Sequence, residues 1–418
     1  MSTLTFSTLR TDFAGLSLVD IAKEYGTPTY LYDAAKIAQR IDDLRAFDCI
    51  RFAQKACSNL AILDRARRAG VKVDAVSAGE IGRALAAGFA PQDIVYTADI
   101  FDAAALQLVV AHRLTVNCGS PDMIDQLGKV FPGASVTLRI NPGFGHGHSQ
   151  KTNTGGPQSK HGIWHDQIDQ CLLSADRWGI GVSGLHMHIG SGTDLEHLSQ
   201  VCQAMLEAAR RVGRSLTTIS AGGGLPVPYR EGEQFVDIEA YFSLWDKTRK
   251  VLEGEFQHPL GLEIEPGRYL VAEAGALLTE IRAVKRMGEN LFYLVDAGFN
   301  DLARPVMYGA YHPISICPRD SFIDRPEVDV VVGGPLCESG DIFTQKEGGF
   351  VDSRKLPIAQ VGDLLMLENA GAYGFVMASN YNSKQRPAEV LIEHGRAKLI
   401  RRRETFEDLI RGEIIPPS

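Results

Sequence analysis

The chain has 418 residues, more than one ordinary domain contains and enough for two. Its 44% hydrophobic and 22% charged residues are typical of a globular protein that buries a large core. With 43 basic and 51 acidic residues the net charge is −8, and both signs are interspersed, which argues against nucleic acid as a partner.

The sequence also lacks the usual signs of export and of membrane insertion. The N-terminal residues are polar throughout, so no signal peptide is predicted, and no run of eighteen apolar residues predicts a membrane span. The seven cysteines are scattered and form no CxxC pair, which favours free thiols in a reducing compartment over a disulfide framework or a zinc site. We therefore expect a cytoplasmic protein.

From residue 50 onward, short apolar runs alternate with helical patterns. Eight runs predict strands, at 51–56, 71–77, 93–98, 114–119, 135–142, 181–190, 216–224 and 260–267. The first helix is expected to be capped by Ser58 and to end at Gly70, and the next to begin with a capping box of Ser77 and Glu80. This alternation predicts an α/β fold, a parallel (β/α)₈ barrel of the TIM type. A doubly wound open sheet is the alternative, because periodicity alone does not prove closure.

After about residue 270 the alternation of strand and helix patterns gives way to strand patterns almost alone. Further strands are predicted at 276–286, 290–298, 328–334, 363–369 and 388–395, and helical periodicity returns only at 404–411. We therefore expect a barrel domain at 30–270 and a β-rich second domain, resembling a sandwich or barrel, formed by 1–29 and 271–418. The polar, glycine-rich stretch 146–162 is too long for a simple connection and is a candidate active-site loop.

Polar residues lie at the ends of the predicted strands, where a (β/α)₈ barrel has its active site. They are Lys55, Asp74, Ser77, Arg139, Asn141, His186, His188, Ser191, Gly222–Gly224, Glu265 and Arg268. Each alone has an ordinary explanation: a lysine extends its amine to water, three glycines make a tight turn, and a histidine sits satisfied in the core. Together on one rim they indicate a site.

The residue types on this rim indicate one kind of ligand. Lys55 has no carboxylate within four residues, so its amine is a candidate nucleophile, and Gly222–Gly224 can offer backbone N–H groups to a phosphate. Arg268 and Ser191 can bind the same anion or a nearby one. Without a third histidine or cysteine at ligand spacing no metal is expected, and an imidazole serves better as a flat surface against a ring. With Glu265 beside a protonated ring nitrogen, the set describes pyridoxal 5′-phosphate (PLP).

The same stretches resemble the diaminopimelate decarboxylases, in the alanine-racemase-like class of PLP enzymes that also holds the ornithine and arginine decarboxylases. The resemblance covers essentially the whole chain. It runs through FAQKACSN, VDAVSAGEIGRALAAGF, RINPGFGHGHSQKTNTGG, GLHMHIGSG, SAGGGLPVPY, EIEPGRYLV, VDAGFNDLARPVMYGAYH, GPLCESGDIF and NAGAYGFVMASNYNSKQRPAEVL. It implies PLP as cofactor and a homodimer whose active sites are shared across the interface.

The resemblance also implies roles for individual residues. Lys55 would carry PLP as a Schiff base, His188 would stack on its ring, and Glu265 would pair with the pyridine nitrogen. The other cofactor-binding residues that it implies are Asp74, Arg139, Ser191, Gly224, Pro266, Gly267, Arg268 and Tyr373. The substrate-binding residues that it implies are Arg268, Arg304, Tyr308, Glu338 and Tyr373. The catalytic residues that it implies are Lys55, His188 and Cys337. Cys337 would reach the site from the second subunit and act as the proton donor.

We therefore expect decarboxylation of meso-2,6-diaminopimelate to L-lysine and CO₂. Glu338 would recognise the distal ammonium group and Arg304 the distal carboxylate, which ornithine lacks. An ordinary thiol such as Cys337 is protonated at neutral pH and suits a proton donor. Two alternatives stay open: an ornithine- or arginine-type decarboxylase, and a catalytically inactive homologue that regulates a partner protein. Cys337 as a small buried residue and Arg304 as a surface ion-pair partner are the ordinary interpretations of those two positions.

Overall fold

The computed structural model describes residues 6–145, 154–188, 195–320 and 325–417. Two compact units divide the chain. The barrel unit contains Gln39–Pro226 and Phe235–Leu270, and the β-rich unit contains Met1–Ala38, Val227–Gln234 and Val271–Ser418. Each unit is described by itself below.

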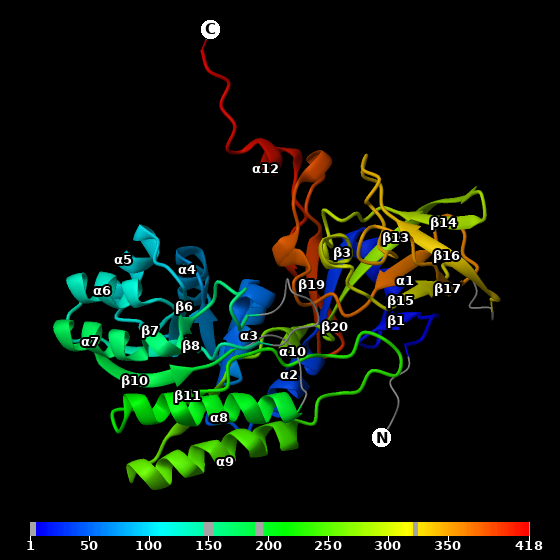
Figure 1. The fold of residues 1–418 in the computed structure, drawn as a ribbon. Helices are drawn as coiled ribbons and strands as arrows, with labels where there is room; N and C mark the ends of the chain where they lie inside the picture. Colours follow the sequence, from blue (N-terminus) through cyan, green and yellow to red (C-terminus); the bar gives the residue numbers. More distant parts are fainter. Residues whose placement is uncertain (1–5, 146–153, 189–194, 321–324, 418) are drawn as a thin grey trace. The chain divides into compact units, whose positions relative to one another are not determined.

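The barrel unit is built on eight parallel strands (Figure 1). They are β4 (Cys49–Ala53), β5 (Lys72–Ala75), β6 (Ile94–Ala98), β7 (Thr115–Cys118), β8 (Ser135–Asn141), β10 (Gly181–His186), β11 (Thr218–Ser220) and β12 (Gly261–Ile264). Along the chain each pairs with the next, β12 pairs with β4, and β10 pairs directly with β8, so the sheet closes on itself. A two-residue strand β9 (Ile163–Trp164) pairs in parallel with the end of β8. The predicted (β/α)₈ barrel is confirmed, and the open-sheet alternative is wrong.

Helices connect these strands on the outside of the barrel (Figure 1). They are α3 (Leu60–Arg68), α4 (Ala78–Ala86), α5 (Ala103–His112), α6 (Pro121–Val130), α7 (Ile168–Trp178), α8 (Leu195–Val212) and α9 (Ile238–Phe256), while α2 (Ala34–Asp42) precedes β4 and α10 (Arg268–Val271) follows β12. Ser77 caps α4 as predicted, accepting from the Glu80 N–H at 3.2 Å, but the Glu80 carboxylate accepts from the Val76 N–H instead of closing the capping box. The predicted Ser58 cap is wrong: Asn59 caps α3, its side chain accepting from Ala61 at 2.9 Å.

The barrel strands end earlier than their apolar runs. The run 51–56 ends as a strand at Ala53, and Gln54–Ala56 forms a single 3₁₀ turn. The run 181–190 likewise ends as a strand at His186. Apolar character continues past the last ladder bond because the rim turns still pack on their neighbours, so hydrophobicity alone overestimates strand length. Lys55 and His188 therefore lie past the ends of their strands, whereas Asp74, Arg139 and His186 lie on the strands themselves.

The β-rich unit contains eleven strands within the described residues. They are β1 (Asp12–Phe13), β2 (Leu16–Ser17), β3 (Thr29–Asp33), β13 (Gly275–Met287), β14 (Asn290–Val295), β15 (Ile314–Cys317), β16 (Glu327–Gly333), β17 (Arg354–Pro357), β18 (Leu364–Leu367), β19 (Ala388–Glu393) and β20 (Arg396–Arg401). The main sheet has the order β17-β16-β14-β13-β3-β19-β20, and β18 pairs with both β13 and β15. The N-terminal strand β3 thus lies between β13 and β19, which ties the start of the chain to its last third. The predicted β-rich second part is confirmed.

A helix of the N-terminal segment covers part of this β-rich sheet. Helix α1 (Leu18–Tyr25) buries Leu18, Ile21 and Ala22, three residues at helical spacing, in a core that includes Leu31 of β3 and Leu278 of β13. Burying one such leucine contributes about 2 kcal/mol. Two other short helices are α11 (Arg304–Tyr308) and α12 (Phe406–Ile410).

One segment of the β-rich unit comes from the middle of the barrel sequence. Residues 227–234 lie between β11 and α9 in the chain, yet they group with the β-rich unit. The Asn369 side chain donates to the carbonyl of Pro228 at 3.0 Å, which ties this segment to the turn after β18. All seven cysteines are free thiols. Among the described helices, none combines the length and apolar character that crossing a bilayer requires.

Candidate active site

Lys55 lies on the turn that follows β4. Its neighbours Gln54 and Ala56 are buried, and Gln54 donates to the Glu80 carbonyl at 3.1 Å, which anchors the turn, whereas Lys55 itself is exposed. Its apolar neighbours suggested a lysine inside a strand, and that expectation is wrong because β4 has already ended. The positive charge of Lys55 favours the ionised form of Asp74 and the neutral form of His188, so the amine lies within electrostatic reach of both.

Glu265 follows β12 and is held by two polar partners. Its Oε2 lies 2.7 Å from His186 Nε2, and its Oε1 accepts from the Asn117 side chain at 3.2 Å. Burial opposes ionisation, but the charge and hydrogen bond of His186, with the charges of Arg51 and Arg139, lower the pKa of Glu265 below its ordinary value. The site therefore holds a buried, ionised carboxylate. His186 was among the predicted rim residues, but its pairing with Glu265 and the contact of Asn117 were not predicted from the sequence.

Asp74, on β5, has the opposite electrostatics. It is buried, and its Oδ1 has no hydrogen-bond partner in the part of the chain that the structure describes. Burial, together with the negative charge of Glu265, raises the pKa of Asp74 to about 7, against weaker lowering effects of Thr97 and Lys55. Two neighbouring carboxyl groups are thus separated by their surroundings into an anion and a group that holds a proton near neutrality.

His188 lies two residues beyond the end of β10. Burial, and the positive charges of Arg139 and Lys55, hold the pKa of His188 well below its usual range, so the ring is neutral. Its Nδ1 is buried without a partner among the described residues, while its carbonyl accepts from the Thr154 hydroxyl at 2.9 Å. A neutral imidazole at the rim presents a flat face to a ring without adding charge.

Three glycines follow β11, and two of them, Gly222 and Gly223, pack closely against His188 and Glu265. At Gly222 the φ angle is +62°, and a Cβ would lie 2.4 Å from the Met187 carbonyl oxygen and 2.7 Å from His188 Cβ. At Gly223 a Cβ would lie 2.5 Å from the Glu265 carbonyl oxygen, and Gly224 has a φ angle of +95°. Only glycine fits the φ angles and close contacts of this turn, and such a turn presents backbone N–H groups to an anion.

The structure places most other predicted residues of the barrel unit at the same rim. Arg139 is buried near the end of β8, paired in register with His186 of β10. Pro266 and Gly267 are buried just before Arg268, which begins α10 and is half-buried.

Part of the predicted loop and one predicted residue lie outside the described residues. Ser191 and positions 146–153 are not among them. In the described part of the loop, the Asn141 side chain both donates to the Gly156 carbonyl at 3.1 Å and accepts from the Gly156 N–H at 2.9 Å. The end of β8 and the end of this loop are therefore tied together.

Apart from Arg268, which lies in the barrel unit, the predicted substrate-binding residues belong to the β-rich unit. Arg304 is 7% exposed at the start of α11, so its interpretation as a surface ion-pair partner is wrong. Tyr308 at the end of α11 is half-buried, as is Tyr373, which has a φ angle of +58°. Glu338 is exposed.

The loop that carries Cys337 is held from both sides. The Cys337 N–H donates to Asn382 Oδ1 at 2.7 Å, and the Asp341 carboxylate accepts from the Leu336 N–H at 2.8 Å. The thiol is exposed on the single chain, so the interpretation of Cys337 as a small buried residue is wrong. The loop is thus anchored by hydrogen bonds while the Cys337 thiol stays accessible to another molecule.

The residues at the barrel rim fit PLP. Two buried polar atoms, Asp74 Oδ1 and His188 Nδ1, have no partner among the described residues, and the Gly222–Gly224 turn excludes side chains. An accessible amine at Lys55 and an ionised carboxylate at Glu265 complete the set. Within the described residues, no group of three or more His, Cys, Asp or Glu is arranged to hold a metal ion.

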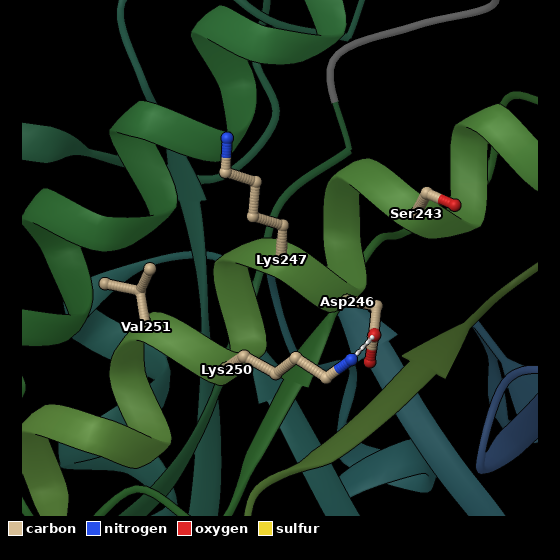
Figure 2. A pocket seen from close by; sticks show the side chains of 5 residues that line it. All are labelled: Ser243, Asp246, Lys247, Lys250 and Val251. Atoms are coloured by element: carbon tan, nitrogen blue, oxygen red, sulfur yellow. Dashed lines mark ion pairs between the residues drawn. The ribbon is translucent and has the colours of Figure 1, made fainter.

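A separate pocket of about 520 Å³ lies on α9 (Figure 2). Its lining consists of Ser243, Asp246, Lys247, Lys250 and Val251, none of which was predicted as a site residue. Asp246 pairs with Lys250 at 2.7 Å, so part of the charge of this pocket is neutralised along one helix, and Lys247 leaves it with a net positive charge. It is a solvated face of the helix and not part of the rim.

A closed parallel barrel with a lysine at one strand end, a glycine turn, a neutral histidine and a buried carboxylate defines a PLP-dependent enzyme. The family described as pyridoxal-dependent decarboxylase, pyridoxal binding domain, matches residues 35–272. The chain belongs to the diaminopimelate decarboxylases.

Its relatives match over nearly their whole length. The diaminopimelate decarboxylase of Escherichia coli K12 is 54% identical over 411 residues, covering 97% of this chain and 98% of that protein. The Streptomyces coelicolor diaminopimelate decarboxylase is 53% identical, covering 96% and 92%. Among solved structures, a diaminopimelate decarboxylase with 53% identity has a TM-score of 0.94 and covers 97% of this chain and 99% of that one. A Helicobacter pylori diaminopimelate decarboxylase complexed with L-lysine has 31% identity and a TM-score of 0.84, covering 94% and 98%.

Proposed function

We infer that the protein decarboxylates meso-2,6-diaminopimelate to L-lysine and CO₂ with PLP as its cofactor, a step of lysine biosynthesis. The observation that carries this inference is 54% identity to a diaminopimelate decarboxylase across 97% of the chain. It is supported by the convergence of Lys55, His188 and Glu265 at the barrel rim. For the cofactor-binding domain we propose 30–270, and for the second domain 1–29 with 271–418, except that residues 30–38 and 227–234 group with the β-rich unit.

The residues of the barrel rim would hold the cofactor. Bound PLP supplies an electron sink for the electron pair that the departing CO₂ leaves behind. The Lys55 amine would hold the cofactor at its aldehyde group, and the Gly222–Gly224 turn would bind its phosphate through backbone N–H groups. The Glu265 carboxylate would stabilise positive charge on the ring nitrogen, because its own pKa is lowered and it stays ionised. His188 would offer its neutral ring to the ring of the cofactor. The remaining predicted cofactor contacts are Asp74, Arg139, Ser191, Gly224, Pro266, Gly267, Arg268 and Tyr373.

Residues of the β-rich unit, with Arg268 of the barrel unit, would bind the substrate. Arg304 binds the distal carboxylate and Glu338 the distal ammonium group, while Arg268, Tyr308 and Tyr373 complete the substrate site. Cys337 of a second copy delivers the proton that replaces CO₂, since its loop is anchored and its thiol is accessible. The working form is therefore a cytoplasmic homodimer with two shared sites.

Two measurements on the purified enzyme test this function. CO₂ release from meso-diaminopimelate, L-ornithine and L-arginine is compared, and the borohydride-reduced protein is digested for mass spectrometry. We expect release from diaminopimelate alone and the pyridoxyl mass on the peptide that contains Lys55. Lys55→Ala should lose both, whereas Lys247→Ala, at an exposed lysine of α9, should keep both.

Other outcomes identify the alternatives. Release from ornithine or arginine alone would replace the substrate assignment. The absence of both CO₂ and bound pyridoxyl, after incubation with PLP, would leave a regulatory homologue as the function. A pyridoxyl mass on another lysine would overturn the Lys55 assignment.

A further inference from the structure

Arg304 is held by two residues that the sequence did not indicate. Its Nη1 donates to Tyr229 Oη at 3.2 Å and lies 2.9 Å from His312 Nε2. A guanidinium group has donors only, so the Nε2 of His312 must be the acceptor. Both hydrogens of Nη1 are thereby directed, and the plane of the guanidinium group is set.

The other nitrogen of His312 determines its tautomer. Nδ1 lies 2.9 Å from the carbonyl oxygen of Glu368, which only accepts, so Nδ1 carries the hydrogen. His312 is 3% exposed. The ring therefore works as a neutral bridge, with a lone pair aimed at Arg304 by a backbone carbonyl on its far side.

Tyr229 is held in place by independent contacts. Its N–H donates to Glu233 Oε2 at 2.7 Å, and its ring packs edge-on against His312 with centroids 5.5 Å apart. The Arg304 guanidinium carbon lies 5.0 Å from the Tyr229 ring centroid, at cation–π distance. The 227–234 segment thus delivers one side chain that touches Arg304 through both its hydroxyl and its ring face.

We propose that His312 and Tyr229 are positioning residues that orient Arg304 for the distal carboxylate of the substrate. This inference rests on the proposed function, in which Arg304 binds that carboxylate. A bidentate arginine–carboxylate contact requires the two planes to align, and an arginine side chain loses several rotatable bonds when it is immobilised. Bonds made before the substrate arrives lower that cost, and the gain appears as affinity for the carboxylate.

The test compares the substrate with a ligand that has no carboxylate to offer Arg304. L-lysine, the product, keeps the distal carboxylate, whereas 1,5-diaminopentane lacks it. The KM for meso-diaminopimelate and the inhibition constant of 1,5-diaminopentane are measured on the holoenzyme and its variants. His312→Asn retains a donor toward the Glu368 carbonyl but places no acceptor at the Nε2 position. It should raise the KM by about tenfold, the effect of losing one charge-assisted hydrogen bond, with kcat within about twofold of wild type.

Three further variants separate positioning from general damage. His312→Gln places a carbonyl oxygen near the Nε2 position and should recover most of the KM. Tyr229→Phe, which keeps the ring, should raise the KM by roughly threefold. His394→Asn makes the same exchange at an exposed turn with a φ angle of +51°, which asparagine tolerates, and should change nothing. The inhibition constant of 1,5-diaminopentane should stay unchanged in all of them.

Arg304→Gln separates the positioning role from the proposed function. If it raises the KM for diaminopimelate relative to the inhibition constant of 1,5-diaminopentane while His312→Asn and Tyr229→Phe do not, the positioning role is overturned and the proposed function stands. If Arg304→Gln leaves that ratio unchanged, the assignment of Arg304 in the proposed function fails. A parallel rise of both constants in His312→Asn would mean lost structure instead of lost positioning. Should His312→Asn not fold, Tyr229→Phe in wild-type and Arg304→Gln backgrounds gives the same decision, because positioning predicts no additional effect without the arginine.

Discussion

At the scale of single residues, two carboxyl groups at the barrel rim illustrate how surroundings assign chemistry. Glu265 and Asp74 are both buried, but only Glu265 has an imidazole and an amide within hydrogen-bond distance. Its pKa falls, whereas burial beside that anion raises the pKa of Asp74 to about 7. One group is thus committed to the charged state before any ligand binds, and the other can take up or release a proton near neutrality.

The raised pKa of Asp74 predicts a pH dependence of stability. The folded chain binds a proton at Asp74 between about pH 4 and pH 7 that the unfolded chain does not, so this residue's contribution to stability is lost as the pH rises through that range. Asp74→Asn does not titrate. We therefore expect the unfolding free energy of Asp74→Asn, relative to that of wild type, to be higher at pH 8 than at pH 5 by about 2 kcal/mol.

Urea unfolding of the apoenzyme, followed by the fluorescence of the buried Trp245, measures this difference in the barrel unit. Asp176→Asn, at an exposed position on α7, is the control and should follow wild type at both pH values. A difference between Asp74→Asn and wild type that does not vary with pH would contradict the raised pKa.

Single residues were predictable where their position along a strand carried the signal. Lys55, His188 and Glu265 follow predicted strands, and parallel strands of one barrel bring their ends to one rim. The partners of these residues were not predictable. Asn117 reaches Glu265 across 148 residues of sequence and Tyr229 reaches Arg304 across 75, and no local pattern marks which polar side chains meet at such separations.

At the scale of elements, the turn after β11 is the tightest constraint on the site. It passes between the backbones of two neighbouring strand ends, so its glycines are required by space as well as by φ angle. The strand itself contributes only Thr218–Ser220 to the sheet. The turn is therefore as much a part of the closed barrel as the strand that precedes it.

Gly222→Ala should accordingly destabilise the protein by about 2–4 kcal/mol, because a left-handed φ angle and a contact of 2.4 Å to the Met187 carbonyl both oppose a side chain. The control is Gly82→Ala inside α4, where a Cβ meets nothing within 4 Å, and it should be neutral or stabilising by up to about 1 kcal/mol. Thermal unfolding of both variants is the measurement. Equal melting temperatures for the two would show that the turn yields to a side chain.

Elements were predicted well where hydrophobic period and length agreed, as in the eight barrel strands. Their ends were predicted less well, because capping depends on one hydrogen bond that adjacent residues can both supply. Asn59, not Ser58, caps α3, and both are good capping residues by type. The sequence pattern places a helix start within a residue or two, and backbone geometry decides between neighbours.

At the scale of the whole molecule, the proposed shared sites predict complementation. Lys55→Ala and Cys337→Ala should each be nearly inactive, since each removes one essential group from every site. After subunit exchange, half of the dimers are mixed, and each mixed dimer contains one intact site, so equal amounts should regain about a quarter of wild-type activity. Activity is measured as CO₂ release, and exchange is followed with differently tagged subunits. Exchange without recovered activity would mean that both groups come from the same chain.

The whole-molecule division was only partly predictable. The change of pattern near residue 270 marks the start of the β-rich sequence, and Val271 begins the last part of that unit. Residues 227–234 carried no such mark, because eight residues with a proline between a strand and a helix look like an ordinary loop. Only the contacts of Pro228 and Tyr229 show which unit they serve.

The excursion of 227–234 means that the chain changes unit four times, at 38–39, 226–227, 234–235 and 270–271. Neither half corresponds to one uninterrupted stretch of coding sequence. A chimera with a distant homologue, spliced at the change of pattern alone, would combine one parent's Tyr229 with the other parent's Arg304 and His312. Recombination of the two halves therefore has to transfer this eight-residue insert together with the C-terminal portion.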